Sequence, residues 1–312
     1  MLDIQAIIDQ HLAEDREPYT GGVVWASDVG KCPRKAMLRA NGVLPTNTFA
    51  DYATDPAWVR VTAAYGNLVE EHLTGAALKA VLEGQGISVS WNPTFKGLHP
   101  VWSGRPDFVI GHRTDNVAII EHKVTGGDHK PERWKIPSPY FPVKEHVAQL
   151  YLYGYLYNHA YGVMPTLILF YRTFKHHAQF EIQVSPLETL AVGHIDGTPY
   201  ETSVDINPIH IIAEYERMFT ANEVPQAYKP GEKGYGDHCV FFGKPSCDYF
   251  DLCHNGAEMV KVEKLLPINS KAWQRRRAKA EEEKQVRQAA REPQVQIEEP
   301  TVKGWDINDI SF

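Results

Sequence analysis

The sequence has few cysteines, four among 312 residues, and no long apolar run. No stretch of eighteen apolar residues occurs, so we expect no membrane-spanning helix. Residues 1–18 lack the basic start and the apolar stretch of a secretory signal peptide, and we therefore expect a cytoplasmic protein. No GxxxxGK[ST] phosphate-binding loop occurs, so no helicase motor with that motif is expected within the chain.

The chain also lacks an excess of positive charge, since its formal net charge is −7. This argues against a surface that is basic throughout, but a local groove of Lys and Arg side chains can still bind nucleic-acid phosphates. The hydrophobic share of 43% and the charged share of 23% are typical of a soluble globular protein. The length allows one substantial core with a small appendage.

Apolar periodicity and turn residues predict helices alternating with strands. We expect helices over 1–13, after Ser27-Asp28, over 58–82, 143–161 and 208–221, and strands over 87–91, 105–111, 117–123, 166–173 and 179–184. The turn-forming segment 112–116 should join two of these strands as a hairpin, and the Pro-, Gly- and Cys-rich segment 225–256 should be loop. The pattern predicts an α/β fold over 1–263, with a central mixed sheet flanked by helices. A charged helix and an acidic, mobile tail should follow over 264–312.

Two carboxylates and a lysine occupy the predicted hairpin. Asp107 follows Gly-Arg-Pro on the first strand, and Glu121 and Lys123 share a face of the second because alternate residues of a strand point the same way. Paired strands would bring the three side chains together. Carboxylate oxygens bind hard cations such as Mg²⁺ or Mn²⁺, and a nearby lysine can stabilise developing negative charge. The alternative is a surface Glu–Lys ion pair, which the apolar run before Glu121 disfavours.

This arrangement resembles motifs II and III of the PD-(D/E)XK nuclease superfamily. Gln149 and Tyr153, four residues apart on one helical face, are similar to the Q-x-x-x-Y motif of its RecB-type branch, although Tyr153 alone could be a core aromatic residue. Residues 65–73, YGNLVEEHL, are similar to the G-x-x-x-H-E helix motif of that branch, with Glu70 where the histidine usually stands. The resemblance covers roughly residues 25–255.

The resemblance implies a restriction-endonuclease-like core and a metal-dependent DNA nuclease. The implied ligands of Mg²⁺ or Mn²⁺ are Glu70, Asp107, Glu121 and the backbone carbonyl of His122. Lys123 would act on the nucleophile, while Gln149 and Tyr153 would align the substrate. The branch implies an exonuclease acting on single-stranded DNA or DNA ends in recombination, repair or replication, in a bacterial or phage-infected cell. The alternatives are a DNA-binding adaptor that does not cut and a structure-specific endonuclease.

The four cysteines form a second pattern, with one near the N-terminus and three in a C-x7-C-x5-C arrangement: Cys32, Cys239, Cys247 and Cys253. Reduced thiols are expected in the cytoplasm, so disulfides are disfavoured. The pattern resembles the iron–sulfur staple of the CRISPR-associated exonucleases and AddB-type helicase–nucleases, where the usual spacing is C-x2-C-x5-C. This implies a 4Fe-4S cluster. Zn²⁺, with His238 or His254 as substitute ligands, and buried thiols without metal are the alternatives.

Basic side chains near these motifs are candidate DNA contacts. Arg34, Lys35 and Arg39 accompany Cys32, and Arg105 lies beside Asp107, so all four could contact phosphates; a solvated helix face is the alternative for the first three. The C-terminal residues 304–312, GWDINDISF, resemble the tip of bacterial single-stranded-DNA-binding proteins. Four tail residues would then recruit a replication or recombination protein or shield the chain's own basic groove: Trp305, Asp306, Asp309 and Phe312. The alternative is a solubilising end.

Overall fold

The computed structural model describes residues 23–41, 65–124, 141–173, 175–221 and 224–233, and, within the C-terminal region, 239–241, 244–245, 247 and 249–254. The helix expected over 1–13 lies outside the described residues. So do the extension 264–312 and the tail residues Trp305, Asp306, Asp309 and Phe312. None of the helices in the described part of the chain combines the length and the apolar character needed to cross a bilayer.

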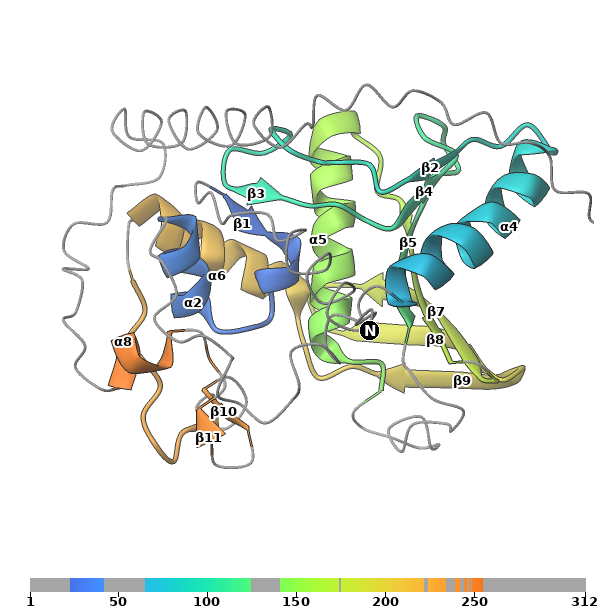
Figure 1. Cartoon of the computed structure of the whole chain (residues 1–312). Helices are drawn as coiled ribbons and strands as arrows, with labels where there is room; N and C mark the ends of the chain where they lie inside the picture. The colour runs from blue at the N-terminus through green and yellow to red at the C-terminus, as the bar shows by residue number, and fades with distance from the viewer. Residues whose placement is uncertain are drawn as a thin grey trace, which may run out of the picture.

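A seven-stranded sheet forms the centre of the molecule, in the order β2-β4-β5-β6-β7-β8-β9. Its strands are β2 (Val89–Trp91), β4 (Phe108–Ile110), β5 (Ala118–Val124), β6 (Thr166–Arg172), β7 (His177–Val184), β8 (Thr189–Ile195) and β9 (Thr198–Ser203). Strands β5 and β6 are parallel, and all other neighbours are antiparallel. The predicted mixed sheet flanked by helices is confirmed (Figure 1).

Helix α5 (Lys144–Tyr161) makes the crossover that joins the parallel strands β5 and β6. It covers one face of the sheet, where Leu150, Leu152 and Leu156 are fully buried. The opposite face is covered by a helix over residues 65–83, consisting of α-helical turns at 65–68 and at α4 (Ala76–Leu78) and of the π-helical segments η3 (Val69–Gly75) and η4 (Lys79–Glu83) (Figure 1). Alternation along β5 explains the two layers, because Ile119 packs in the α5 core and Ile120 packs towards α4.

The remaining described elements pack on the far side of α5 from the main sheet (Figure 1). They are β1 (Val24–Trp25), η1 (Ala26–Asp28), α2 (Pro33–Ala40), β3 (Trp102–Ser103), α6 (Pro208–Ala221), β10 (Val240–Phe241), β11 (Lys244–Pro245) and α8 (Phe250–His254). Strands β1 and β3 pair in parallel, and Trp102 stacks on Tyr215 of α6 at 5.7 Å between ring centroids.

Two local predictions are wrong in this region. Ser27-Asp28 does not cap the cysteine-bearing helix, because these residues form η1 and the helix begins at Pro33, whose missing amide hydrogen suits a first turn. The segment expected to be loop contains the β10–β11 hairpin and the short helix α8.

Candidate active site

Asp107 and Glu121 lie side by side where β4 separates from β5. The register pairs Phe108 with Ile120 as the last residues in the β4–β5 ladder. Beyond that point the backbone amide of His122 donates to Asp107 Oδ2 at 2.6 Å, so a side-chain oxygen replaces the missing backbone acceptor. In this arrangement the carboxyls of Asp107 and Glu121 are close enough for each to shift the pKa of the other. The hairpin therefore joins the two carboxylates that the sequence placed on neighbouring strands.

Both carboxyl groups are in a setting that disfavours their charge. Glu121 is 1% exposed, and burial raises its pKa, while Lys123 opposes the shift. Burial also raises the pKa of Asp107 well above its usual range, and the adjacent charge of Glu121 raises it further. Among the described residues Glu121 Oε2 has no hydrogen-bond donor. A buried carboxylate oxygen in this position fits a cation ligand.

Lys123 places a positive charge next to this pair, and its Nζ contacts Glu121 Oε1. Burial acts to lower the pKa of Lys123, but the charges of Glu121 and Asp107 outweigh it and the pKa is raised. Lys123 therefore stays protonated beside the carboxylates. In this state it can donate hydrogen bonds and stabilise negative charge, but it cannot accept a proton.

Glu70 reaches the same site from η3. Its Oε1 accepts hydrogen bonds from Trp91 Nε1 at 3.2 Å and from Asn92 Nδ2 at 3.3 Å. Burial raises the pKa of Glu70, and the charge of Glu121 adds to the shift, so the two carboxylates share one electrostatic environment. The neighbouring Glu71 instead has a side chain that is 47% exposed and lies near His72. Of the two glutamates, Glu70 is the one that faces the other acidic residues.

Gln149 and Tyr153 approach the carboxylates from α5. Gln149 Nε2 donates to Tyr153 Oη at 2.8 Å, and Tyr153 is only 3% exposed. Burial raises the pKa of Tyr153 well above its usual range, and the charges of Glu121 and Asp107 raise it further. A Cβ atom on Gly104 would lie 2.7 Å from two carbons of the Tyr153 ring, so this glycine is required for the close approach.

The His122 ring points away from this group, as alternation along β5 requires. It is buried, stacks on Phe170 at 5.0 Å between ring centroids, and neither ring nitrogen has a hydrogen-bond partner among the described residues. Burial lowers the pKa of His122 to about 4, so the ring is neutral. Only the backbone of His122 belongs to the carboxylate site.

The side chains at this site are of the types that bind a divalent cation, but they are not arranged around a metal-binding position in this structure. When ionised, the carboxylates of Glu70, Asp107 and Glu121 carry more negative charge than the nearby ammonium group of Lys123 balances, and without a cation their raised pKa values favour the neutral form. Oxygen ligands of this kind are preferred by Mg²⁺ and Mn²⁺. Within the described part of the chain, no three His, Cys, Asp or Glu side chains stand in an arrangement that would hold a metal ion as they are.

The expected basic residues divide into two groups. Arg34 is buried and donates to Cys253 Sγ and to the backbone oxygen of Pro225, and Arg39 forms a 2.5 Å ion pair with Asp28. Both have protein partners, so neither guanidinium is simply directed at solvent. Lys35 is half-buried and Arg105 is exposed, and Arg105 is close enough to Tyr153 to lower the pKa of that phenol.

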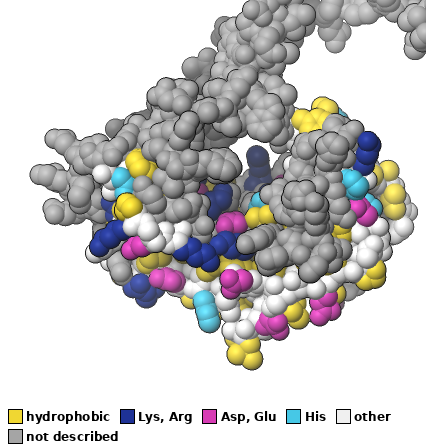
Figure 2. Space-filling model, turned by 90° about the horizontal axis from the view of Figure 1, so that it is seen from below, with side chains coloured by type: hydrophobic (Ala, Val, Ile, Leu, Met, Phe, Trp, Pro, Cys, Tyr) yellow, Lys and Arg dark blue, Asp and Glu magenta, His cyan; other side chains and the backbone are white. Residues whose placement is uncertain are grey.

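Sequence reasoning missed Lys31, which lies between the basic helix and the carboxylate site. Lys31 is exposed as a residue, but the protein packed around its ammonium group lowers its pKa, Asp28 opposes this shift, and Lys35 and Lys123 lower the pKa further. Its ammonium group therefore lies within the field of both a residue on α2 and the lysine of the site. Figure 2 shows Lys and Arg side chains gathered with carboxylates around the middle of one face. A lone lysine before Cys32 has no periodic pattern that could have predicted this placement.

The four cysteines line one cavity, although they come from two distant parts of the sequence. Tyr228, Tyr249, Phe250 and His254 complete much of its wall. Burial raises the pKa of Cys239 to about 12, and the other three cysteines contribute to that shift. Four sulfur atoms around one cavity are the type of donor set that binds zinc or iron as thiolates, but among the described residues these side chains are not arranged closely enough to hold a metal ion as they stand.

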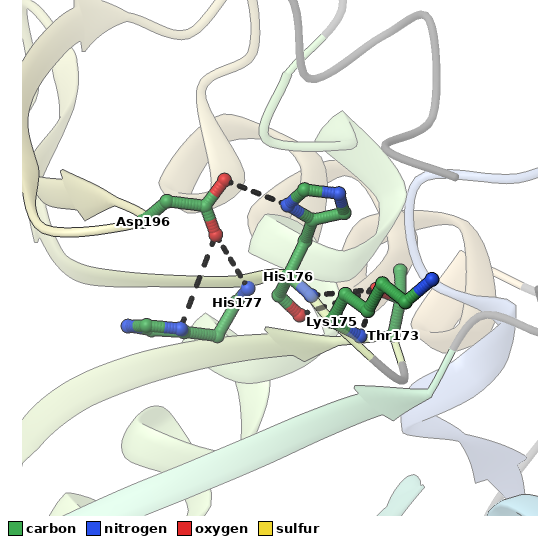
Figure 3. A network of polar contacts seen from close by, with 5 residues as sticks. All are labelled: Thr173, Lys175, His176, His177 and Asp196. Carbon is green, nitrogen blue, oxygen red and sulfur yellow. Dashed lines mark hydrogen bonds and ion pairs between the residues drawn. The ribbon is translucent and has the colours of Figure 1, made fainter. Parts of the chain in front are cut away.

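A separate network of hydrogen bonds links two turns at the ends of strands in the main sheet (Figure 3). Asp196 Oδ1 accepts a hydrogen bond from the backbone amide of His177 at 2.9 Å, and Asp196 Oδ2 lies 3.0 Å from His176 Nδ1. Thr173 Oγ1 accepts hydrogen bonds from the amides of Lys175 and His176. These contacts hold the β6–β7 and β8–β9 turns together, and no catalytic role follows from them.

Comparison with known proteins identifies no family for this chain. No protein-family model matches the sequence, and no curated protein matches it. One solved structure, described as "Crystal structure of SSO0001", aligns with 69% of this chain and 82% of its own, at 17% sequence identity and a TM-score of 0.35. A likeness of this degree does not identify an activity.

Proposed function

We propose that this chain is a metal-dependent DNA nuclease with a restriction-endonuclease-like core of the PD-(D/E)XK type. The observation that carries the proposal is the pairing of the buried Glu121 carboxylate with the half-buried Asp107 carboxylate beside the ammonium group of Lys123. Glu70 joins them from a helix on the other side of the sheet. A structural ion pair needs only one carboxylate for one ammonium group, whereas the carboxylates of Glu121, Asp107 and Glu70 all act on Lys123 here.

Each residue has a chemical task in this proposal. Glu70, Asp107, Glu121 and the His122 carbonyl would hold Mg²⁺ or Mn²⁺, which supplies positive charge to the scissile phosphate and makes the attacking water more acidic. Lys123 stabilises the negative charge that develops in the transition state. Gln149 and Tyr153 orient the nucleotide, with the Tyr153 hydroxyl held by Gln149. Lys31, Lys35 and Arg105 are the described basic residues best situated to contact phosphates.

We propose exonuclease action on single-stranded DNA or DNA ends, in recombination, repair or replication, as the resemblance to the RecB-type branch implies. A cytoplasmic setting in a bacterial or phage-infected cell belongs to the same proposal. The tail residues 304–312 remain a proposed docking segment for a replication or recombination protein.

The four-cysteine cavity is proposed to hold a 4Fe-4S cluster, with Zn²⁺ as the alternative. The support is the convergence of all four cysteines on one cavity. Such a centre would join α2 to the segment containing α8 and would supply folding free energy that a small loop-rich segment lacks. The visible spectrum of anaerobically purified protein, with metal analysis, separates the possibilities. Broad visible absorbance with bound iron supports the cluster, bound zinc supports the alternative, and protein free of both metals contradicts a metal centre.

Activity is tested on linear single-stranded, linear double-stranded and circular single-stranded DNA, each with Mg²⁺, with Mn²⁺ and with EDTA. We expect cleavage of linear DNA that EDTA abolishes. Lys123→Met should reduce kcat by about 10²–10³-fold, as expected for loss of one electrostatic contact to the transition state. Lys79→Met, which alters an exposed lysine on the outer helix, is the matched control.

The alternatives give different results in the same assay. DNA binding without cleavage, unaffected by Lys123→Met, would point to an adaptor protein. Cleavage of circular single strands would point to an endonuclease. Cleavage that persists in EDTA would contradict the proposed metal dependence.

A further inference from the structure

Arg34 brings a buried positive charge to the wall of the four-cysteine cavity. Its side chain lines the cavity together with Cys32 and Cys253, and the residue is 8% exposed. Arg34 Nε donates to Cys253 Sγ at 3.3 Å, and Arg34 Nη1 donates to the backbone oxygen of Pro225 at 2.8 Å. The guanidinium is thus fixed in direct contact with one of the four sulfur atoms.

A buried guanidinium needs a counter-charge, because an isolated charge is expensive to remove from water. Within the described part of the chain, no ion pair joins Arg34 to a carboxylate. Arg34 donates hydrogen bonds to two described atoms: the Pro225 oxygen, which is neutral, and the sulfur of Cys253. The remaining candidates on this wall are the sulfur atoms.

Neutral thiols would not balance Arg34. Four thiolates bound to a zinc ion or to a 4Fe-4S cluster carry a net negative charge, and they would balance it. The N–H···S hydrogen bond has the donor direction that a negatively charged sulfur ligand favours. The contact also explains why an arginine beside Cys32 is buried, whereas a residue that contacts DNA phosphates would remain accessible.

We propose that Arg34 is the counter-charge of a thiolate-bound metal centre formed by Cys32, Cys239, Cys247 and Cys253, and that it stabilises Cys253 as a ligand. The inference rests on the metal centre of the proposed function. It assigns Arg34 to metal retention instead of DNA contact. Hydrogen bonds of this kind around metal ligands typically change metal affinity by about 10–100-fold when they are removed.

The test measures metal content and metal release in purified full-length protein. A chromogenic chelator is added, bathophenanthroline for iron or 4-(2-pyridylazo)resorcinol for zinc, and its concentration at half-release is compared among variants. Arg34→Gln keeps a hydrogen-bond donor but loses the charge, and Arg34→Lys keeps the charge but loses the forked geometry. Arg113→Gln is the control, because Arg113 lies over Tyr161 and not at the cysteine cavity.

We expect Arg34→Gln to release half of its metal at a chelator concentration at least about tenfold lower than the wild type requires. Arg34→Lys should lie between the two, and Arg113→Gln should match the wild type. Half-release of Arg34→Gln at the wild-type concentration, with metal present in both, would overturn the role of Arg34 and leave the metal centre standing. Wild-type protein that is purified without metal would contradict both the metal centre and the role of Arg34. Nuclease activity is measured in a separate assay, so its presence or absence does not affect this test. If Arg34→Gln does not fold, as judged by circular dichroism, Arg34→Lys decides: folded but metal-free protein refutes the inference, and retained metal supports it.

Discussion

Replacing Gly104 by alanine tests whether the close approach of Tyr153 matters for the site. The added Cβ would lie 2.7 Å from two Tyr153 ring carbons and 3.4 Å from Leu156 Cδ1, so the tyrosine ring has to move. Overpacking of this kind in a filled core typically costs about 1–3 kcal/mol. For a chain of this size that corresponds to a fall in Tm of roughly 2–12 °C.

The displaced ring should also reduce activity, because the Tyr153 hydroxyl would leave the position that Gln149 holds. A loss of the equivalent of 1.4 kcal/mol would lower kcat/KM about tenfold. The assay is thermal unfolding and DNA cleavage of Gly104→Ala, with Gly66→Ala as the control for thermal unfolding alone, since a Cβ on Gly66 meets nothing within 4 Å.

A double-mutant comparison isolates the contact from any other effect of the alanine. In a Tyr153→Ala background the ring is absent, so Gly104→Ala should then change Tm by much less than in the wild type. Equal destabilisation in both backgrounds would show that the clash with Tyr153 is not the cause. An unchanged Tm in the single variant would refute the packing argument itself.

Two further predictions concern the charges and the hydrogen bond of the site. Asp107 has a raised pKa in the folded chain, so the metal-free protein holds this proton more tightly than the unfolded chain does, and its stability falls as pH rises through the raised pKa. In EDTA, Tm should therefore fall more for the wild type than for Asp107→Asn as the pH is raised above the usual carboxyl range, and equal slopes would contradict a raised pKa for Asp107. Tyr153→Phe removes only the hydroxyl that accepts from Gln149. We expect a loss of about 1 kcal/mol, measured as a roughly fivefold lower kcat/KM with Mg²⁺, and full activity would show that the hydroxyl has no part in catalysis.

The strand positions of the site were readable because period-two patterns and a turn segment specify a hairpin and its two faces. The strands β8 and β9 were not predicted, even though Asp196 and Gly197 between them have the positive φ angles of a tight hairpin turn. Gly193 interrupts the apolar pattern of β8, and it is required there because a Cβ would lie 1.9 Å from the backbone oxygen of Gln179. A glycine is required at position 193 because β7 packs against it, and this contact cannot be read from the residues around Gly193 in the sequence.

Distant partners also bear on the choice between neighbouring residues of the same type. The sequence motif favoured Glu70 over the adjacent Glu71 as a ligand, and in the structure the donors Trp91 and Asn92 bind Glu70. For the basic residues near Cys32, helical spacing could not show that Arg34 turns towards Cys253, which lies 219 residues later in the chain.

The two sites have opposite imbalances of charge, and each imbalance points to a different occupant. The carboxylates of Asp107, Glu121 and Glu70 outnumber the ammonium group of Lys123, so a bound cation would be needed to balance them when they are ionised. Arg34 is buried beside the cysteines and has no carboxylate partner among the described residues. Negatively charged thiolates at this cavity would balance its charge. Without a metal the raised carboxyl pKa values favour protonation at the first site, whereas the guanidinium of Arg34 cannot lose its charge in this way. A bound divalent cation at one site and a thiolate-bound metal at the other would relieve both imbalances, so removing either metal should lower the stability of the chain as well as its activity.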